Sequence, residues 1–155
     1  MGKEIERKYL IDKKKWDVLA KPEPVFIQQN YILNKKPISL RARIIDNKGF
    51  IAIKKGKGVS RLEYEYEIPL MDAKELLHLD NQFEPIEKER YRIPYGKHIW
   101  DVDIFLGENR GLIVAEIELS CEEEAFEKPD WVIKEVTSIR KYFNTNLQTR
   151  PYKMW

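Results

Sequence analysis

Along most of the chain, hydrophobic and polar residues alternate with a period of two, the pattern of amphipathic β-strands. Such stretches are predicted at residues 4–11, 25–33, 38–45, 50–54, 61–68, 86–93, 99–105 and 112–119. Short turn-forming segments separate them, for example Asn47-Lys48-Gly49. Eight strands with short connections favour an antiparallel meander. Closure into a barrel would remove the exposed edges of that sheet, although the pattern alone also allows an open sheet.

A few segments break this period and predict short helices. Asp12 is expected to cap a helix that follows the first strand. Asp72, with Glu75 three residues later, resembles a capping box ahead of a leucine-rich stretch. From Glu122 onward we expect a turn at 129–131 and one or two short helices. No repeat or linker divides the sequence, so the prediction is one mainly β (α+β) domain over residues 1–155.

The composition narrows the possible functions. Charged residues make up 35% of the chain, against roughly 25% in typical soluble domains. Yet 28 basic and 26 acidic residues leave a net charge of only +2, which argues against a nucleic-acid binder with a simple basic face. No apolar stretch approaches the length of a membrane span, so we expect no membrane partner and a cytoplasmic location. The single cysteine, Cys121, cannot form an internal disulfide and is expected to be packed.

The charges are segregated by strand. Within most predicted strands, charges of one sign lie two residues apart and therefore share a face. The acidic pairs are Glu4/Glu6, Glu63/Glu65, Asp101/Asp103 and Glu116/Glu118, and the basic pairs are Arg41/Arg43 and Lys88/Arg90. Judged singly, each strand fits a sheet whose charged face is in water. Taken together, the like-charged pairs favour a site that binds metal ions on one wall and an anion on another, because solvated faces usually mix signs.

The residue types also suggest a specific chemistry. Mg²⁺ and Mn²⁺ prefer hard oxygen ligands, which clustered carboxylates supply. Lysines and arginines on neighbouring strands can grip the oxygens of a polyanion, and arginine can do so with two hydrogen bonds. Phosphoryl transfer depends mostly on such positioning and charge neutralisation. The two histidines, His78 and His98, lie outside the pattern. Charges inside a barrel are costly unless paired or ion-bound, so we expect a water-filled tunnel.

At this point the sequence resembles a known family. Glu4-Ile5-Glu6-Arg7-Lys8 matches the E-x-E-x-K signature of the CYTH superfamily, the triphosphate tunnel metalloenzymes. The similarity continues in order along almost the whole chain. Further matching segments are Gln29-Asn30-Tyr31 (Asn30 replacing the usual glycine), Arg41-Ala42-Arg43, Ile53-Lys54, residues 60–65, 87–91, 100–103 and 115–118, and 140–144, where Lys141 stands in a position that is commonly arginine.

The resemblance implies a closed eight-stranded antiparallel barrel whose charged face points inward, with one or two Mg²⁺ or Mn²⁺ ions as cofactor. It implies metal ligation, in part through waters, by Glu4, Glu6, Glu63, Glu65, Asp103, Glu116 and Glu118. It implies substrate binding by Lys8, Arg41, Arg43, Lys54, Arg61, Arg90 and Lys141. Tyr31 and Lys88 would lie near the scissile phosphate, where Lys88 could stabilise the leaving group. Packing alone remains an alternative for Tyr31, as does a structural ion pair for Arg61.

The shared tunnel motifs do not choose among the activities of this superfamily. The compact chain most resembles prokaryotic tripolyphosphatases, so we expect metal-dependent hydrolysis of inorganic triphosphate to pyrophosphate and phosphate. The alternatives are a class IV adenylyl cyclase, a thiamine or nucleoside triphosphatase, and a polyphosphate-binding module without turnover. The expected partner is a small triphosphate and not nucleic acid. A homodimer remains open.

Overall fold

The computed structural model describes residues 2–79 and 82–155. Over these ranges it contains three α-helices: α1 (Lys13–Val18), α2 (Leu70–Leu77) and α3 (Asn144–Thr149). The strands in the same ranges are β1 (Gly2–Ile11), β2 (Val25–Lys35), β3 (Ile38–Ile45), β4 (Lys48–Lys57), β5 (Ser60–Ile68), β6 (Ile86–Tyr95), β7 (His98–Phe105), β8 (Ile113–Glu118) and β9 (Val132–Glu135). None of the described helices is both long enough and apolar enough to cross a membrane.

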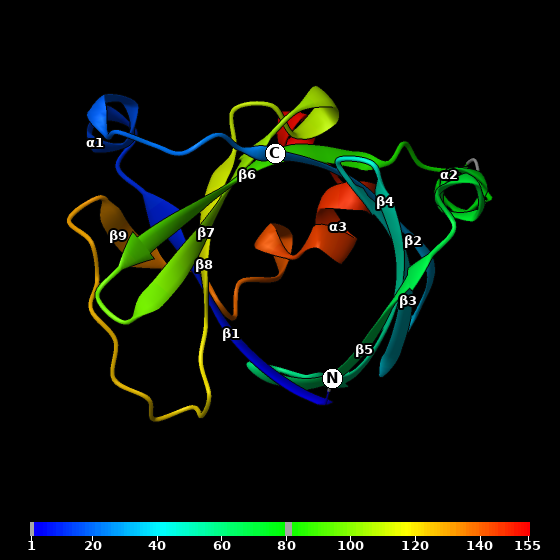
Figure 1. The fold of residues 1–155 in the computed structure, drawn as a ribbon, viewed down its shortest axis with the longest axis horizontal. Helices are drawn as coiled ribbons and strands as arrows, with labels where there is room; N and C mark the ends of the chain where they lie inside the picture. The colour runs from blue at the N-terminus through cyan, green and yellow to red at the C-terminus, as the bar shows by residue number, and fades with distance from the viewer. Residues whose placement is uncertain (1, 80–81) are drawn as a thin grey trace.

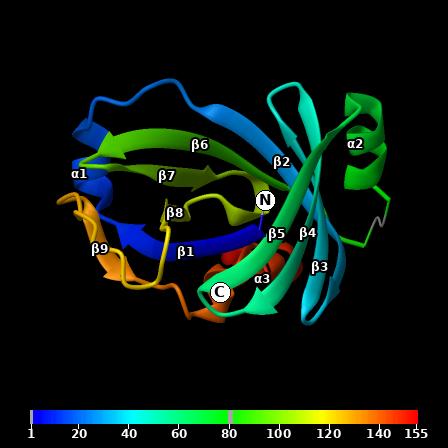
Figure 2. The same ribbon diagram turned by 60° about the horizontal axis from the view of Figure 1, so that its bottom comes forward.

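The strands close into a barrel. The sheet runs in the order β5-β4-β3-β2-β6-β7-β8-β1-β9, and β5 also pairs with β1. This last ladder, from Gly2 opposite Glu63 to Ile5 opposite Ser60, seals the ring. Figures 1 and 2 show the closed ring of strands, with α1 and α2 outside it and α3 within its outline in Figure 1. The expected closed eight-stranded antiparallel barrel is confirmed in the described part of the chain, with β9 as an addition beside β1.

The largest core cluster lies outside the barrel wall, on the strand faces opposite the charged ones. Tyr9, Trp16, Trp100 and Trp131 pack between β1, β7, α1 and the segment that leads to β9, mostly with edge-to-face ring contacts. Trp100 is completely buried. Burial of aromatic side chains of this size contributes on the order of 4–6 kcal/mol each before conformational entropy is subtracted. This outer core holds rigid the strands that carry the lumen charges.

A second, smaller core docks α2 on the other side of the barrel. Ala73 and Leu77 of α2 pack against Ala42 and Ile44 of β3. Gly49 of β4 permits this approach, because a Cβ atom at that position would lie 2.5 Å from the Cβ of Ala73. The outward, apolar positions of β3 therefore face a helix, while its alternate positions face the lumen.

Several local expectations can be checked against the structure. The Asp12 cap is confirmed, since its carboxylate accepts hydrogen bonds from the amides of the first helical turn. The Asp72 capping box is wrong: α2 begins one turn earlier, after Pro69, and Asp72 lies in its first turn. Cys121 is exposed and not packed, because β8 ends at Glu118 and the thiol falls in the following loop. Strand β9 was not anticipated in the tail.

Candidate active site in the charged tunnel

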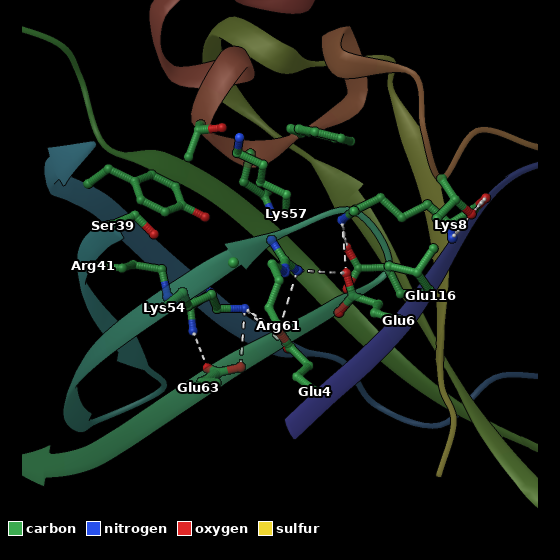
Figure 3. Close-up of a pocket in the computed structure, with 18 of the residues that line it drawn as sticks. Glu4, Glu6, Lys8, Ser39, Arg41, Lys54, Lys57, Arg61, Glu63 and Glu116 are labelled. Carbon is green, nitrogen blue, oxygen red and sulfur yellow. Dashed lines mark hydrogen bonds and ion pairs between the residues drawn. The ribbon is translucent and has the colours of Figure 1, made fainter. Parts of the chain in front are cut away.

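Alternation along the strands directs the charged side chains into the lumen. They line a cavity of about 740 Å³, which Figure 3 shows in close-up. Among the described residues that line it, eleven are basic and seven are acidic. The excess of positive charge favours an anionic ligand, because the low-dielectric barrel wall concentrates the positive potential of these residues in the cavity. The cavity size is within the range of small-molecule sites.

One wall is acidic. Register pairs Glu6 of β1 with Glu118 of β8, and Glu4 and Glu63 converge from β1 and β5. Burial raises the pKa of Glu118, and the neighbouring charges of Glu4, Glu6 and Glu63 raise it further. These carboxylates therefore crowd one another, and a cation placed among them would relieve the repulsion.

The acidic groups are also held by lumen lysines. Lys8 donates to Glu116 at 2.5 Å and lies 3.2 Å from Glu6. Lys54 contacts Glu4 at 3.0 Å and Glu63 at 3.1 Å. Burial opposes the charge of Lys8, but Glu116 and Glu6 outweigh it and raise the pKa of Lys8. Lys8 is thus a fixed cation inside the tunnel.

Arg61 of β5 lies at the same acidic wall. Its guanidinium contacts Glu4 at 3.3 Å and Glu6 at 3.8 Å. The side chain is 30% exposed and lines the cavity, so both a structural ion pair and substrate contact remain compatible with its position.

The opposite wall is built by β3 and carries two arginines. Arg41 reaches Glu65 at 3.0 Å and Glu63 at 3.3 Å, and Arg43 reaches Glu65 at 2.7 Å. Burial lowers the pKa of Arg43, and the charge of neighbouring Arg41 lowers it further. Glu65 therefore compensates two guanidinium groups only partly. An anion bound here would complete the compensation and could accept two hydrogen bonds from each arginine.

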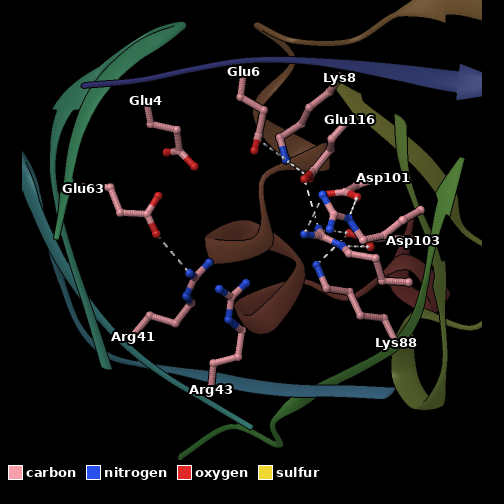
Figure 4. Close-up of polar contacts among 12 residues, drawn as sticks. Glu4, Glu6, Lys8, Arg41, Arg43, Glu63, Lys88, Asp101, Asp103 and Glu116 are labelled. Atoms are coloured by element: carbon pink, nitrogen blue, oxygen red, sulfur yellow. Dashed lines mark hydrogen bonds and ion pairs between the residues drawn. The ribbon is translucent and has the colours of Figure 1, made fainter. Parts of the chain in front are cut away.

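Lys88 forms the most deeply buried part of the site. Its ammonium lies 2.6 Å from Asp103, and the two side chains are 1% and 0% exposed. Figure 4 shows Lys88 and Asp103 side by side. Arg90 binds the same carboxylate at 2.6 Å through Nε and also reaches Glu116 at 3.1 Å. Burial lowers the pKa of Lys88 to about 8; Asp103 opposes this, while Arg90 adds to it. The amine is thus poised between its charged and neutral forms near physiological pH.

The C-terminal segment lines one end of the lumen. Arg140 and Phe143 contribute to the cavity wall together with Asn144 and Thr145 of α3. Lys141, which the sequence predicted as a substrate ligand, is instead placed over the Trp155 ring at 4.3 Å and does not line the cavity. Arg140 was missed, and its only signal in the sequence was the basic pair that it forms with Lys141.

Most of the sequence-predicted residues are thus brought together in one lumen. Tyr31 lies on β2 opposite Arg41 and lines the cavity. Asp103 is the other predicted site residue besides Lys141 that does not line it, because it lies behind Lys88 and Arg90. Arg92, two residues after Arg90 on β6, is 63% exposed and contacts Asp101 at 3.3 Å.

The donor set fits a divalent cation, although the carboxylates are engaged elsewhere in this structure. In residues 2–79 and 82–155, no three acidic, histidine or cysteine side chains converge as a preformed metal cluster. The reason is visible in the contacts: Glu4, Glu63 and Glu116 each hold a lysine or an arginine. Their oxygens are nevertheless the ligands that Mg²⁺ and Mn²⁺ prefer, and they are mutually repelling. Metal binding would require these side chains to exchange partners.

Comparison with known families identifies this charged barrel. The sequence profile of the CYTH domain matches residues 2–152. The chain belongs to the CYTH family. An inorganic triphosphatase from Acetivibrio thermocellus is 46% identical to this CYTH domain over 154 residues, covering 99% of this chain and 97% of the relative. An inorganic triphosphatase from Nitrosomonas europaea is 32% identical over 150 residues, covering 93% and 95%.

Solved structures agree with the fold of this CYTH domain. A crystal structure of an inorganic triphosphatase superposes with a TM-score of 0.63 at 27% identity, covering 93% of this chain and 96% of the other. The structural similarity therefore covers nearly the whole chain. The resemblance drawn from the sequence motifs is confirmed.

Proposed function

We propose that this CYTH domain hydrolyses inorganic triphosphate to pyrophosphate and phosphate inside the barrel lumen, with Mg²⁺ or Mn²⁺ as cofactor. The observation that carries the proposal is the lumen itself, in which opposed acidic and basic walls surround a cavity large enough for a small polyanion. Relatives at 46% and 32% identity that are named inorganic triphosphatases support the choice of reaction.

In this proposal the acidic wall holds one or two metal ions. Glu4, Glu6, Glu116 and Glu118 come from the adjacent strands β1 and β8, and Glu63 and Glu65 assist from β5. A bound divalent ion would neutralise phosphate charge and lower the pKa of a coordinated water. Asp103, which lies behind Lys88 and Arg90, would orient both of these side chains through its two carboxylate oxygens.

The basic residues hold the phosphate groups. Arg41 and Arg43 of β3 line the cavity, and so do Lys8, Lys54 and Arg90, which come from three other strands. All five are now paired with carboxylates. A bound triphosphate would replace part of that pairing with charge-assisted hydrogen bonds to its own oxygens. Fixing the substrate in this way supplies the positioning on which phosphoryl transfer depends.

Lys88 and Tyr31 are the proposed catalytic groups. At pH values below its pKa of about 8, the ammonium of Lys88 is charged. It can then stabilise the negative charge that develops on the leaving pyrophosphate, and it can donate a proton to that group. Tyr31 lines the cavity opposite Arg41, where its hydroxyl can contact the same phosphate.

The proposal is tested by measuring phosphate release from tripolyphosphate, ATP and thiamine triphosphate, each with Mg²⁺, Mn²⁺ or EDTA. We expect fast, metal-dependent release from tripolyphosphate and slow release from the organic substrates. Phosphate release from thiamine triphosphate or ATP that is as fast as, or faster than, release from tripolyphosphate would show that the substrate is an organic triphosphate. Pyrophosphate and cyclic AMP from ATP would assign a cyclase, and tight binding without release from any substrate would leave a binding module.

A further inference from the structure

A buried glutamine lies beside the basic wall without an assigned role. Gln29 of β2 is 0% exposed. Neither its amide oxygen nor its amide nitrogen has a hydrogen-bonding partner among the described residues. Leaving buried polar atoms unsatisfied costs on the order of 1–3 kcal/mol for each group, which is why such atoms are rare in folded proteins. A glutamine retained in this state calls for an explanation beyond packing.

The register places Gln29 next to a phosphate-binding candidate. Its Cα partners are Arg43 on β3 and Ile86 on β6. Side chains that oppose each other across an antiparallel pair project from the same face, with Cβ atoms about 4.5–5.5 Å apart. Gln29 therefore projects from the inner face of β2, as Tyr31 does two residues later, and lies beside Arg43.

Arg43 carries a complementary unsatisfied group. Its terminal Nη2 donates to both oxygens of Glu65, at 2.7 and 2.8 Å. Its Nε, which is also buried, has no partner in the described part of the chain. An amide oxygen that can accept and an Nε–H that can donate thus lie on neighbouring strands, both unused. Because Glu65 holds the far end of the guanidinium, Arg43 is oriented by that carboxylate in the ligand-free tunnel.

We propose that Gln29 is the positioning residue for Arg43 in the anion-bound tunnel, and the role rests on the proposed function. When triphosphate oxygens replace Glu65 at the terminal nitrogens of Arg43, the Gln29 amide oxygen accepts the Nε–H. That bond fixes the guanidinium plane so that its two remaining nitrogens present a fork to one phosphate group. The buried amide oxygen is unsatisfied in the free protein and satisfied in the complex, so its contribution strengthens binding selectively.

The neighbouring glutamine provides a matched control. Gln28 lies one residue earlier on the outer face of β2 and donates to Glu87 at 3.0 Å. It has the same side chain on the same strand but no contact with the lumen. Substitution of each glutamine by methionine preserves the length and approximate shape of the side chain and removes the hydrogen-bonding atoms.

The first test compares Gln29→Met with Gln28→Met by thermal unfolding and by calorimetric titration with tripolyphosphate in EDTA. For Gln29→Met we expect the melting temperature to rise by about 2–4 °C, because unsatisfied atoms are removed. Tripolyphosphate affinity should fall about tenfold, the equivalent of one charge-assisted hydrogen bond. Gln28→Met should leave the affinity unchanged. If Gln29→Met folds poorly, Gln29→Asn retains the amide one methylene shorter and should show the same loss of affinity.

The second test asks whether Gln29 acts through Arg43. Arg43→Lys keeps the positive charge but has no Nε–H, so adding Gln29→Met to it should cause no further loss of affinity. An additive loss of affinity in the double variant would overturn the positioning role. Unchanged affinity of Gln29→Met alone would also overturn it and would show that Gln29 serves only in packing. Both outcomes leave the triphosphatase proposal intact. Failure of the wild-type protein both to bind tripolyphosphate in EDTA and to hydrolyse it with Mg²⁺ would instead overturn both proposals.

Discussion

Replacement of Lys88 by arginine should change the pH dependence of the reaction in a defined direction. The wild-type ammonium loses its proton near pH 8, so kcat/KM should fall as pH rises through that value. An arginine keeps its charge throughout the accessible range. Lys88→Arg should therefore have a lower kcat/KM than the wild type. Its kcat/KM should also begin to fall only above about pH 10.

The size of the effect follows from the burial of Lys88. Lowering its pKa from 10.5 to about 8 corresponds to about 3 kcal/mol against the charged form. Lys8 is also buried, yet its pKa is raised, because Glu116 and Glu6 both pair with it. Lys88 shares its carboxylate, Asp103, with Arg90, and the shared carboxylate does not offset the desolvation.

The same titration contributes to stability with a definite sign. Between pH about 8 and 10.5, the unfolded chain retains a proton that Lys88 has lost in the folded protein. The contribution of Lys88 to the free energy of unfolding therefore rises with pH across this window, and its full penalty of about 3 kcal/mol is present below pH 8.

The assay is initial-rate hydrolysis of tripolyphosphate from pH 6 to 10 at saturating Mg²⁺, for both proteins in the same buffers. Ionisation of the substrate and of the metal-bound water affects both profiles, so the difference between them isolates residue 88. An alkaline decline at the same pH in Lys88→Arg as in wild type would refute the assignment of that decline to Lys88. A melting-temperature measurement at each pH would show that both proteins remain folded.

Three further substitutions have expected outcomes. Glu116→Gln should raise the Mg²⁺ concentration needed for half-maximal activity by at least about tenfold while the circular dichroism spectrum is retained; an unchanged metal titration would exclude Glu116 as a ligand. Arg140→Ala should raise the KM for tripolyphosphate about two- to fivefold, because one partly screened positive charge is lost from the cavity. Lys141→Ala should leave this KM unchanged, because Lys141 does not line the cavity. A larger effect of Lys141→Ala than of Arg140→Ala would contradict the placement of these side chains. Asp12→Ala should lower the melting temperature by about 2–4 °C at unchanged activity, and a full retention of stability would show that the cap is dispensable.

The strand pattern was predictable because side chains in a strand alternate strictly between two faces. Strand β3, for example, begins and ends at the predicted residues, Ile38 and Ile45. Which face was inside could not be deduced from the residues of one strand, because a charged face is ordinarily in water. The segregation of charge among strands indicated the reverse orientation, and the order of motifs along the chain identified the tunnel.

The remaining features depend on contacts between distant segments. Cys121 follows an apolar run but lies beyond the end of β8, a boundary that local pattern defines poorly. Lys141 and Arg140 are adjacent basic residues, and only the path of the C-terminal segment determines which one faces the lumen. The burial of Gln29 is likewise set by the β2–β3 and β2–β6 registers.

The most direct test of the account is the product ratio from tripolyphosphate alone, followed by phosphorus NMR with Mg²⁺ and again after EDTA is added. Metal-dependent hydrolysis in the lumen predicts phosphate and pyrophosphate in equal amounts, formation that stops with EDTA, and little formation by Glu116→Gln at the same Mg²⁺ concentration. Continued hydrolysis in EDTA, or full activity of Glu116→Gln at limiting Mg²⁺, would contradict a metal-dependent reaction in this tunnel.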